Sequence, residues 1–432
     1  MKNIAKITVV MTLLLSLLTL SSCSIFSLAS GGNNNLDGYM TKDDANKLIE
    51  GIEENVTVNA GDNYNVTINS SDNGNLLAAA KGLLSTVSIE ASFEITKVYA
   101  PSIFGPGSSE KTEKTAYGSG VIYKLDKNTG SAYIITNYHV VYWNGSDTAD
   151  DVSDDIKIYL YGQEYPEYAI NAEYIGGSMD YDIAVLKVTN SDTLRESKAV
   201  QAEFADSNET CILDTAIAIG NPEALGISAT VGAVNVDSEY ITMTRLDKSG
   251  YISIRVLRID TAVNGGNSGG GLFNDEGKII GIVNAKLVDS SIDNISYAIP
   301  SNVAKYVTDN IIYYDGIDSK NDAVYRALIG VNVDVKSAGV NYDTETGKIL
   351  KYEEVIVSSV TAGSASDGKL MVNDVIKSVT IDGVDYEITR TFNVIDVMLT
   401  ARQSSSVVFH VLRDGASLDI TIDMSRISLT QA

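Results

Sequence analysis

Three residues far apart in the sequence have the side chains that together hydrolyse amide bonds: His139, Asp182 and Ser268. His139 follows the apolar segment of YIITNYHVV, Asp182 precedes that of DYDIAVLKV, and Ser268 lies within AVNGGNSGGGLF. In such a set the hydroxyl attacks a carbonyl carbon, the imidazole takes its proton, and the carboxylate holds the imidazole in one tautomer. The only other histidine, His410, lies near the C-terminus and is expected to be structural. We therefore predict that these three residues are catalytic.

The glycines around Ser268 have a chemical reason. Attack on a carbonyl produces an oxyanion, which is stabilised by backbone N–H groups that point to one place with no side chain between them. We predict that the amides of Gly266 and Ser268 form this oxyanion hole, with Asn267 between them. Taken singly, the histidine could be structural, Asp182 could cap a turn and the glycines could be a linker. Three such coincidences in the right order are less expected than a catalytic set.

A β-rich region must position these side chains. From about residue 81 to 300, a dozen short β-rich segments alternate with turn signals, and helical periodicity is nearly absent. This pattern predicts an all-β domain of barrels or sandwiches. The segment SNVAKYVTDNIIYY is a helix candidate that ends the domain, which we assign to residues 81–314. Residues 320–428 are predicted to form a separate unit of mixed strands and helices.

The N-terminal part of the chain has a different character. Residues 1–22 combine two lysines with fourteen largely apolar residues, fewer than the roughly 20 of a membrane span and typical of a signal peptide. The sequence LSSC, which ends at Cys23, resembles the lipobox of bacterial lipoproteins. This resemblance implies a lipid on Cys23 and a lipoprotein anchored to the cell membrane outside the cytoplasm; ordinary secretion with an incidental cysteine is the alternative. Residues 23–80 are expected to be a tether with a short helix, in TKDDANKLIEGIEEN with Thr41 as its cap, and a hairpin, in NVTVNAGDNYNVTIN.

Composition excludes some classes of function. The 432 residues carry a net charge of −24, so nucleic acid is not expected as a partner. The β-rich region has one histidine and the chain has only two cysteines, which leaves no cluster to bind zinc, and we expect neither a metal nor a cofactor. If Cys23 is lipidated, Cys211 has no disulfide partner and is expected to be a buried, small apolar residue.

The three candidate residues occur in the order His, Asp, Ser, which is the order in chymotrypsin-type folds. Residues from about 80 to 425 resemble the HtrA (high-temperature-requirement) family of trypsin-like serine proteases, in these residues and in the motifs GSGVIY, IGNP, IDTAVNGGNSGG, GKIIGIVNA and ISYAIPSN. The resemblance implies a mainly β protein, with a chymotrypsin-like double β-barrel followed by a PDZ domain. It also implies a homo-oligomer, which in this family is a trimer.

The loop before Ser268 follows the family at one position and departs from it at two. Asn267 stands where pancreatic proteases have an aspartate that receives the new N-terminus on activation, which implies activation by loop ordering and assembly. Gly265 and Gly271 stand where the family usually has proline, so a looser loop is expected. Ala262, six residues before the serine, would lie at the base of the primary specificity pocket. Because Ala262 has no carboxylate, small or medium aliphatic residues are expected before the cleaved bond.

The C-terminal unit resembles a PDZ domain in RALIGVNV, in the segment YEEVIVSSVTAGSASDGKLMVNDVIKSV and in VVFHVLRDG. In that family the amides of a loop hold the C-terminal carboxylate of a peptide, which adds to the sheet as an extra strand. The matching loop is Leu328, Ile329, Gly330 and Val331, in which Ile329 and Val331 would line an apolar pocket. An ordinary strand–turn packing unit is the alternative.

These observations predict an ATP-independent serine endopeptidase that acts outside the cytoplasm on unfolded, misfolded or damaged proteins, with peptide C-termini bound at the PDZ domain. Two other functions remain open. One is a non-proteolytic holdase that uses the same cleft and groove to bind unfolded chains. The other is a regulatory protease that makes one cut in a signalling partner.

Overall fold

The computed structural model describes residues 56–60, 64–68, 74–99, 108–285, 295–315 and 324–431. The predicted signal peptide, Cys23 and the predicted helix that follows Thr41 lie outside these residues. Where the sequence predicts a hairpin, β1 (Val56–Ala60) and β2 (Tyr64–Ile68) pair in antiparallel fashion. No helix within the described ranges is long and apolar enough to span a membrane.

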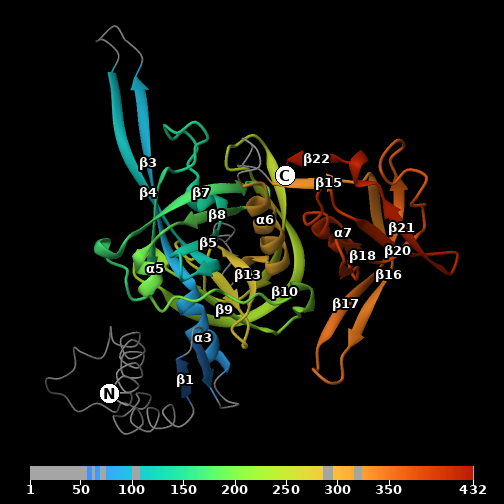
Figure 1. Ribbon diagram of the computed structural model, residues 1–432, viewed down its shortest axis with the longest axis horizontal. Helices are drawn as coiled ribbons and strands as arrows, with labels where there is room; N and C mark the ends of the chain where they lie inside the picture. The colour runs from blue at the N-terminus through green and yellow to red at the C-terminus, as the bar shows by residue number, and fades with distance from the viewer. Residues whose placement is uncertain are drawn as a thin grey trace.

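The first barrel closes antiparallel strands in the order β3-β4-β5-β8-β7-β6. The strands are β3 (Thr86–Tyr99), β4 (Ser108–Asp126), β5 (Ser131–Thr136), β6 (Asp155–Leu160), β7 (Ile170–Ser178) and β8 (Ile183–Val188). Their connections include η1 (Pro166–Tyr168), α4 (Tyr138–Val141) and α5 (Asp192–Glu196). Branched apolar side chains, among them Ile89, Ile134 and Leu186, fill the interior. β3 and β4 stay paired as far as Tyr99 and Ser108, well beyond the barrel (Figure 1).

The second barrel closes in the order β10-β11-β14-β13-β12-β9. Its strands are β9 (Thr215–Gly220), β10 (Ser228–Thr244), β11 (Tyr251–Ile259), β12 (Gly271–Phe273), β13 (Ile279–Asn284) and β14 (Ser296–Pro300). The 3-10 turns η2 (Ser207–Glu209) and η3 (Pro222–Ala224) lie before and after β9. Two closed barrels of six antiparallel strands each confirm the predicted mainly β, chymotrypsin-like architecture.

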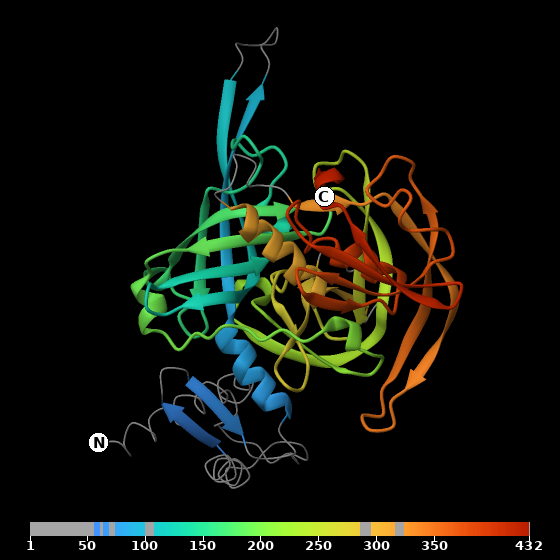
Figure 2. The same ribbon diagram turned by 45° about the vertical axis from the view of Figure 1, so that its right-hand side comes forward.

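Two helices pack against the barrels. The helix α3 (Gly74–Ser85) buries Ala78 in the same cluster as Phe273, so it covers the second barrel. The sequence boundary at residue 81 therefore falls inside a packed helix. The helix α6 (Ser301–Tyr314) has the bounds predicted from the sequence, and it contacts β7 and β8 of the first barrel and β13 and β14 of the second. It therefore joins the two barrels, as Figure 2 shows.

The C-terminal unit is a sheet in the order β16-β17-β18-β20-β21, with β19 beside β18 and with β15 and β22 as a separate pair. The strands are β15 (Tyr325–Leu328), β16 (Val331–Tyr342), β17 (Ile349–Val360), β18 (Val375–Ile381), β19 (Val384–Glu387), β20 (Val407–Arg413), β21 (Ala416–Ile422) and β22 (Ser428–Gln431). The helix α7 (Thr391–Val397) contacts β16, and η5 (Met424–Arg426) precedes β22. In this sheet order β16 is an edge strand.

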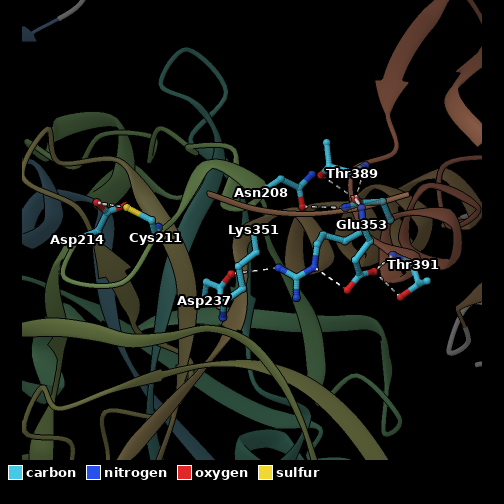
Figure 3. A network of polar contacts seen from close by, with 10 residues as sticks. Asn208, Cys211, Asp214, Asp237, Lys351, Glu353, Thr389 and Thr391 are labelled. Carbon is cyan, nitrogen blue, oxygen red and sulfur yellow. Dashed lines mark hydrogen bonds and ion pairs between the residues drawn. The ribbon is translucent and has the colours of Figure 1, made fainter. Parts of the chain in front are cut away.

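A network of charges joins the second barrel to the C-terminal unit (Figure 3). Asp237, at an irregularity of β10, accepts bonds from Lys351 Nζ at 2.7 Å and Arg390 Nη1 at 3.1 Å. A deeper ion pair joins Arg255 of β11 to Asp396 of α7, and the Arg255 guanidinium lies 4.0 Å from the centre of the Phe392 ring. Both the start and the end of α7 are thus held directly against the second barrel.

Candidate active site

The three predicted catalytic residues meet between the two barrels. His139 lies in α4 directly after β5, and Asp182 directly precedes β8, so both come from the first barrel. Ser268 lies in the loop before β12 of the second barrel. His139 Nδ1 is 2.7 Å from Asp182 Oδ2, and His139 Nε2 is 2.9 Å from Ser268 Oγ. The carboxylate, imidazole and hydroxyl therefore form one continuous hydrogen-bonded chain.

Burial differs along this chain of groups. The Asp182 side chain is 1% exposed and that of His139 is 13% exposed, while Ser268 is 5% exposed. The carboxylate is therefore shielded from water, whereas the imidazole reaches the edge of the site. Such a gradient lets a substrate approach the hydroxyl and the imidazole while Asp182 stays fixed behind them.

Asp182 is held by donors that the sequence did not single out. Its Oδ1 accepts the His139 backbone N–H at 2.9 Å, and its Oδ2 accepts Asn284 Nδ2 at 2.7 Å as well as the imidazole. Asp182 has φ +49°, a left-handed conformation that aspartate tolerates better than most residues, and Asn137 Nδ2 donates to its carbonyl at 2.9 Å. Asn137 and Asn284 are both fully buried. These two asparagines therefore fix the backbone and the carboxylate of Asp182.

The loop before Ser268 is ordered by its own turn. The Asn267 N–H donates to the Asn264 carbonyl at 3.1 Å, and Gly266 has φ +96°. This combination defines a type II turn, whose third residue requires the left-handed backbone that glycine adopts readily. Position 269 requires glycine for two reasons. Its φ is +84°, and a Cβ there would lie 2.2 Å from the Ser119 carbonyl oxygen. Gly266, Asn267 and Ser268 are all buried.

Gly265 and Gly271, which stand where the family usually has proline, differ in the space that surrounds them. Gly271 begins β12, where it pairs with Ile219 and Ile282, and a Cβ on it would lie 2.4 Å from the Phe273 ring. A Cβ on Gly265 would meet nothing within 4 Å. A side chain would therefore be accommodated at 265 but not at 271 without repacking.

Ala262 is exposed, and its carbonyl accepts a bond from Thr230 Oγ1 at 2.8 Å. Its place at the base of a specificity pocket stays a prediction.

In the C-terminal loop, Leu328 is exposed and Ile329 is buried, while Val331 begins β16. Gly330 has φ +77°, and a Cβ there would lie 2.2 Å from the Ser364 side chain. The role of this loop in peptide binding also stays a prediction.

The remaining candidates lie away from Ser268. His410 is on β20, where it bonds to Thr380 Oγ1 and to Asp419, both at 2.8 Å. Cys211 is buried and unpaired, and its Sγ lies 3.2 Å from Asp214 Oδ1. Burial and this carboxylate raise the pKa of the Cys211 thiol to about 11. In the part of the chain that the structure describes, no three His, Cys, Asp or Glu residues are grouped to hold a metal ion.

Comparisons with known proteins agree with this geometry. Residues 118–282 match the family model of the trypsin-like peptidase domain. "Serine protease Do-like HtrA" of Lactococcus lactis subsp. cremoris is 31% identical over 341 residues, which cover 75% of this chain and 76% of that protein. The protein of the same name from Bacillus subtilis is 34% identical over 284 residues, which cover 64% of this chain and 57% of that protein. "Periplasmic serine endoprotease DegP" of Escherichia coli K12 is 29% identical over 334 residues, or 76% of this chain and 60% of that protein.

Among solved structures, "HtrA-type protease AlgW with tripeptide" aligns with a TM-score of 0.48 and 22% identity, over 82% of this chain and 97% of that one. The barrels and the matched domain define the class, a trypsin-like serine endopeptidase. Within that class, the chain belongs to the HtrA family, as the Lactococcus relative shows.

Proposed function

We propose that this protein is an extracytoplasmic, ATP-independent serine endopeptidase that cleaves misfolded or damaged proteins through an acyl-enzyme, with His139, Asp182 and Ser268 as its catalytic residues. One observation carries the proposal. The bonds of 2.7 Å and 2.9 Å link carboxylate, imidazole and hydroxyl in the order that nucleophilic catalysis requires.

In this mechanism Ser268 Oγ attacks the carbonyl carbon of the substrate while His139 Nε2 takes the hydroxyl proton. Asp182 keeps Nδ1 protonated and stabilises the imidazolium that forms. The amides of Gly266 and Ser268 donate to the oxyanion, and loss of such a donor typically costs about 3–4 kcal/mol. His139 then gives its proton to the leaving amine, and a water molecule hydrolyses the ester by the same steps in reverse order.

The C-terminal unit would bind peptides as a PDZ domain does. The loop Leu328–Val331 precedes the edge strand β16, to which an extended peptide could add its backbone hydrogen bonds. The helix α7, which contacts β16, would form the second wall of such a groove. The buried Ile329 and the half-buried Val331 support an apolar pocket for the last side chain of the peptide.

Location and partners rest on the sequence and the relatives. The lipobox-like sequence before Cys23 supports a lipid anchor at the cell membrane, and the E. coli relative is named a periplasmic endoprotease. We further propose a homo-oligomer, a trimer by family resemblance, that acts on unfolded protein substrates.

The test compares purified wild-type protein with Ser268→Ala. We expect wild-type protein to react with a fluorophosphonate and to degrade casein, and Ser268→Ala to do neither. Ser253→Ala, which changes an exposed serine of β11, serves as the matched control and should behave as wild type. Equal casein degradation by Ser268→Ala and wild type would refute the assignment of catalysis to this triad. Suppressed aggregation of a client without any cleavage by the wild type would instead support the holdase alternative.

A further inference from the structure

Ser119 lies directly beneath the loop that carries Gly266 and Ser268. It belongs to β4 of the first barrel, within the GSGVIY motif, and is fully buried. Its hydroxyl donates to the Gly266 carbonyl at 2.7 Å and accepts the Asn221 N–H at 2.8 Å. Its backbone N–H donates to the Ser268 carbonyl at 2.8 Å. One residue of the first barrel therefore binds two carbonyls of a loop of the second barrel.

The bond to Gly266 matters because of where that carbonyl lies. The Gly266 carbonyl and the Asn267 N–H belong to the same planar peptide group. Ser119 Oγ holds the carbonyl end of this plane, and the Asn264 carbonyl holds its N–H end at 3.1 Å. The Gly266 N–H and the Ser268 N–H lie in the peptide planes on either side. Fixing the middle plane at both ends therefore limits how far those two amides can rotate.

The surrounding glycines allow this close approach. A Cβ on Gly220 would lie 2.8 Å from both Ser119 Oγ and Asn267 Oδ1. A Cβ on Gly269 would lie 2.2 Å from the Ser119 carbonyl oxygen. The loop is thus packed onto Ser119 from two sides, and no water is needed to join the hydroxyl to its two backbone partners.

We infer that Ser119 is a positioning residue for the oxyanion hole: its hydroxyl holds the peptide between Gly266 and Asn267 so that the flanking amides face the developing oxyanion. This inference rests on the proposed function and adds a residue to it. Rotation of the loop away from this arrangement would leave the buried Ser119 hydroxyl without an acceptor for its proton and the Gly266 carbonyl without this donor, which disfavours such rotation.

The test is Ser119→Ala, with Ser88→Ala as the matched control. Ser88 is the cross-strand neighbour of Ser119 on β3, is 3% exposed, and has a hydroxyl that bonds to none of the described residues. Both variants remove one buried hydroxyl from the same pair of strands. Loss of an oxyanion donor itself costs about 10²- to 10³-fold in kcat, so a misplaced donor should cost less, roughly 10- to 100-fold.

We expect Ser119→Ala to lower kcat by this factor with KM nearly unchanged, because the hole acts in the transition state. Affinity for a peptide boronate, which places an oxygen in the hole, should fall in parallel. Ser88→Ala should keep both parameters within about twofold of wild type, and Ser119→Cys, which retains a weak donor, should recover part of the loss. Equal kcat values for Ser119→Ala and Ser88→Ala would overturn the inference, as would a loss confined to KM.

The structure of the loop, which can be determined without measuring catalysis, separates this inference from the proposed function. A crystal structure of Ser119→Ala is expected to show the peptide between Gly266 and Asn267, and with it the neighbouring Gly266 amide, rotated relative to the wild-type protein. An unchanged loop would overturn the inference even if Ser268 is the nucleophile. Conversely, hydrolysis by the wild type that persists in Ser268→Ala would overturn the proposed function, whatever the loop of Ser119→Ala looks like.

Discussion

Two buried aspartates, Asp182 at the active site and Asp396 at the junction with the C-terminal unit, are stabilised in different ways. Asp182 is 1% exposed and accepts bonds from the His139 N–H, the His139 imidazole and the Asn284 amide. Asp396 is 7% exposed and pairs with the guanidinium of Arg255. Both carboxylates connect segments far apart in the sequence, but only Asp396 faces a side chain that is always charged.

The two aspartates have different partners because one joins two parts of the molecule and the other takes part in catalysis. A buried ion pair holds two surfaces together, and removing one partner leaves an unpaired charge in the interior. A catalytic carboxylate instead needs a partner that is neutral at rest and charged during turnover, which an imidazole provides. Neutral amide donors can hold Asp182 in place without competing for that role. The site and the junction should therefore respond differently to substitution.

Asp182→Asn should lower kcat about 10⁴-fold, because an amide in place of the carboxylate favours the wrong imidazole tautomer. The thermal unfolding midpoint should change little, since the shape of the side chain is kept. Peptide cleavage followed by fluorescence measures the loss. Asp275→Asn, which changes an exposed aspartate in the turn after β12, should match wild type. A loss of less than tenfold for Asp182→Asn would contradict the role given to this residue.

Arg255→Met should lower the free energy of unfolding by about 3–5 kcal/mol, because it leaves the Asp396 carboxylate buried and unpaired. Urea denaturation followed by tryptophan fluorescence or circular dichroism measures the change. The double variant Arg255→Met/Asp396→Leu should recover much of the loss, since no buried charge remains. If the double variant is no more stable than Arg255→Met, the pair is not what holds this part of the junction.

Asn284→Ala should lower kcat/KM about 10- to 100-fold, because a bond to a charged acceptor contributes about 1.5–3 kcal/mol. The effect should be smaller than that of Asp182→Asn, since two donors to the carboxylate remain. Steady-state kinetics with the same peptide measures it. A value within twofold of wild type would show that the His139 donors alone are enough to position Asp182.

The smallest effect is expected at the edge of the junction, where Lys348 of the C-terminal unit bonds to Asp214 beside Cys211. Only the thiolate reacts with iodoacetamide, and a pKa of about 11 leaves about 0.1% thiolate at pH 8. In a Cys23→Ser background we expect slow labelling of Cys211 that speeds up as the pH rises toward 11. Asp237→Asn removes the carboxylate shared by Lys351 and Arg390 and so weakens the junction beside Cys211. The junction should then open more often, and labelling of Cys211 should become about fivefold faster.

The same experiment has a pH control. Burial works to raise the pKa of Asp237, but Lys351 and Arg390 together hold it below its usual value. A lowered pKa means that this carboxylate stabilises the folded protein at all pH values above its ordinary range near 3.9, and that the contribution disappears only as the pH falls through the lowered value. Opening of the junction, measured as labelling corrected for thiolate fraction, should thus be constant from pH 6 to 8. A change across this range would mean that another group controls it.

The sequence was sufficient for the architecture and for the reacting groups. The short β segments predicted an all-β domain of barrels or sandwiches, and the resemblance to the HtrA family implied the double barrel. The order and setting of His139, Asp182 and Ser268 predicted their convergence. Both inferences depend on local patterns that are legible in a single chain. The helix at Ser301–Tyr314 was predicted for the same reason, because its apolar periodicity and length are local features.

The supporting residues could not be found in this way. Ser119 and Asn284 lie within quoted motifs, but their roles depend on which strands become neighbours across the barrel interface. Arg255 has the same difficulty, since an arginine within a strand gives no sign of the aspartate that it meets 141 residues later. The helix α3 was missed, and its burial depends on contacts with strands of the second barrel that are distant in the sequence.

The nucleophile and its base are supplied by different barrels, and this division has a practical consequence. A fragment that stops before β9 would contain an acid and a base with nothing to activate, and the complementary fragment would contain a hydroxyl with nothing to deprotonate it. The rate of hydrolysis would thus report the docking of the two barrels more sensitively than spectroscopy of the strands does. A shift of about an ångström between the barrels breaks the 2.9 Å contact between His139 Nε2 and Ser268 Oγ while every strand is still folded.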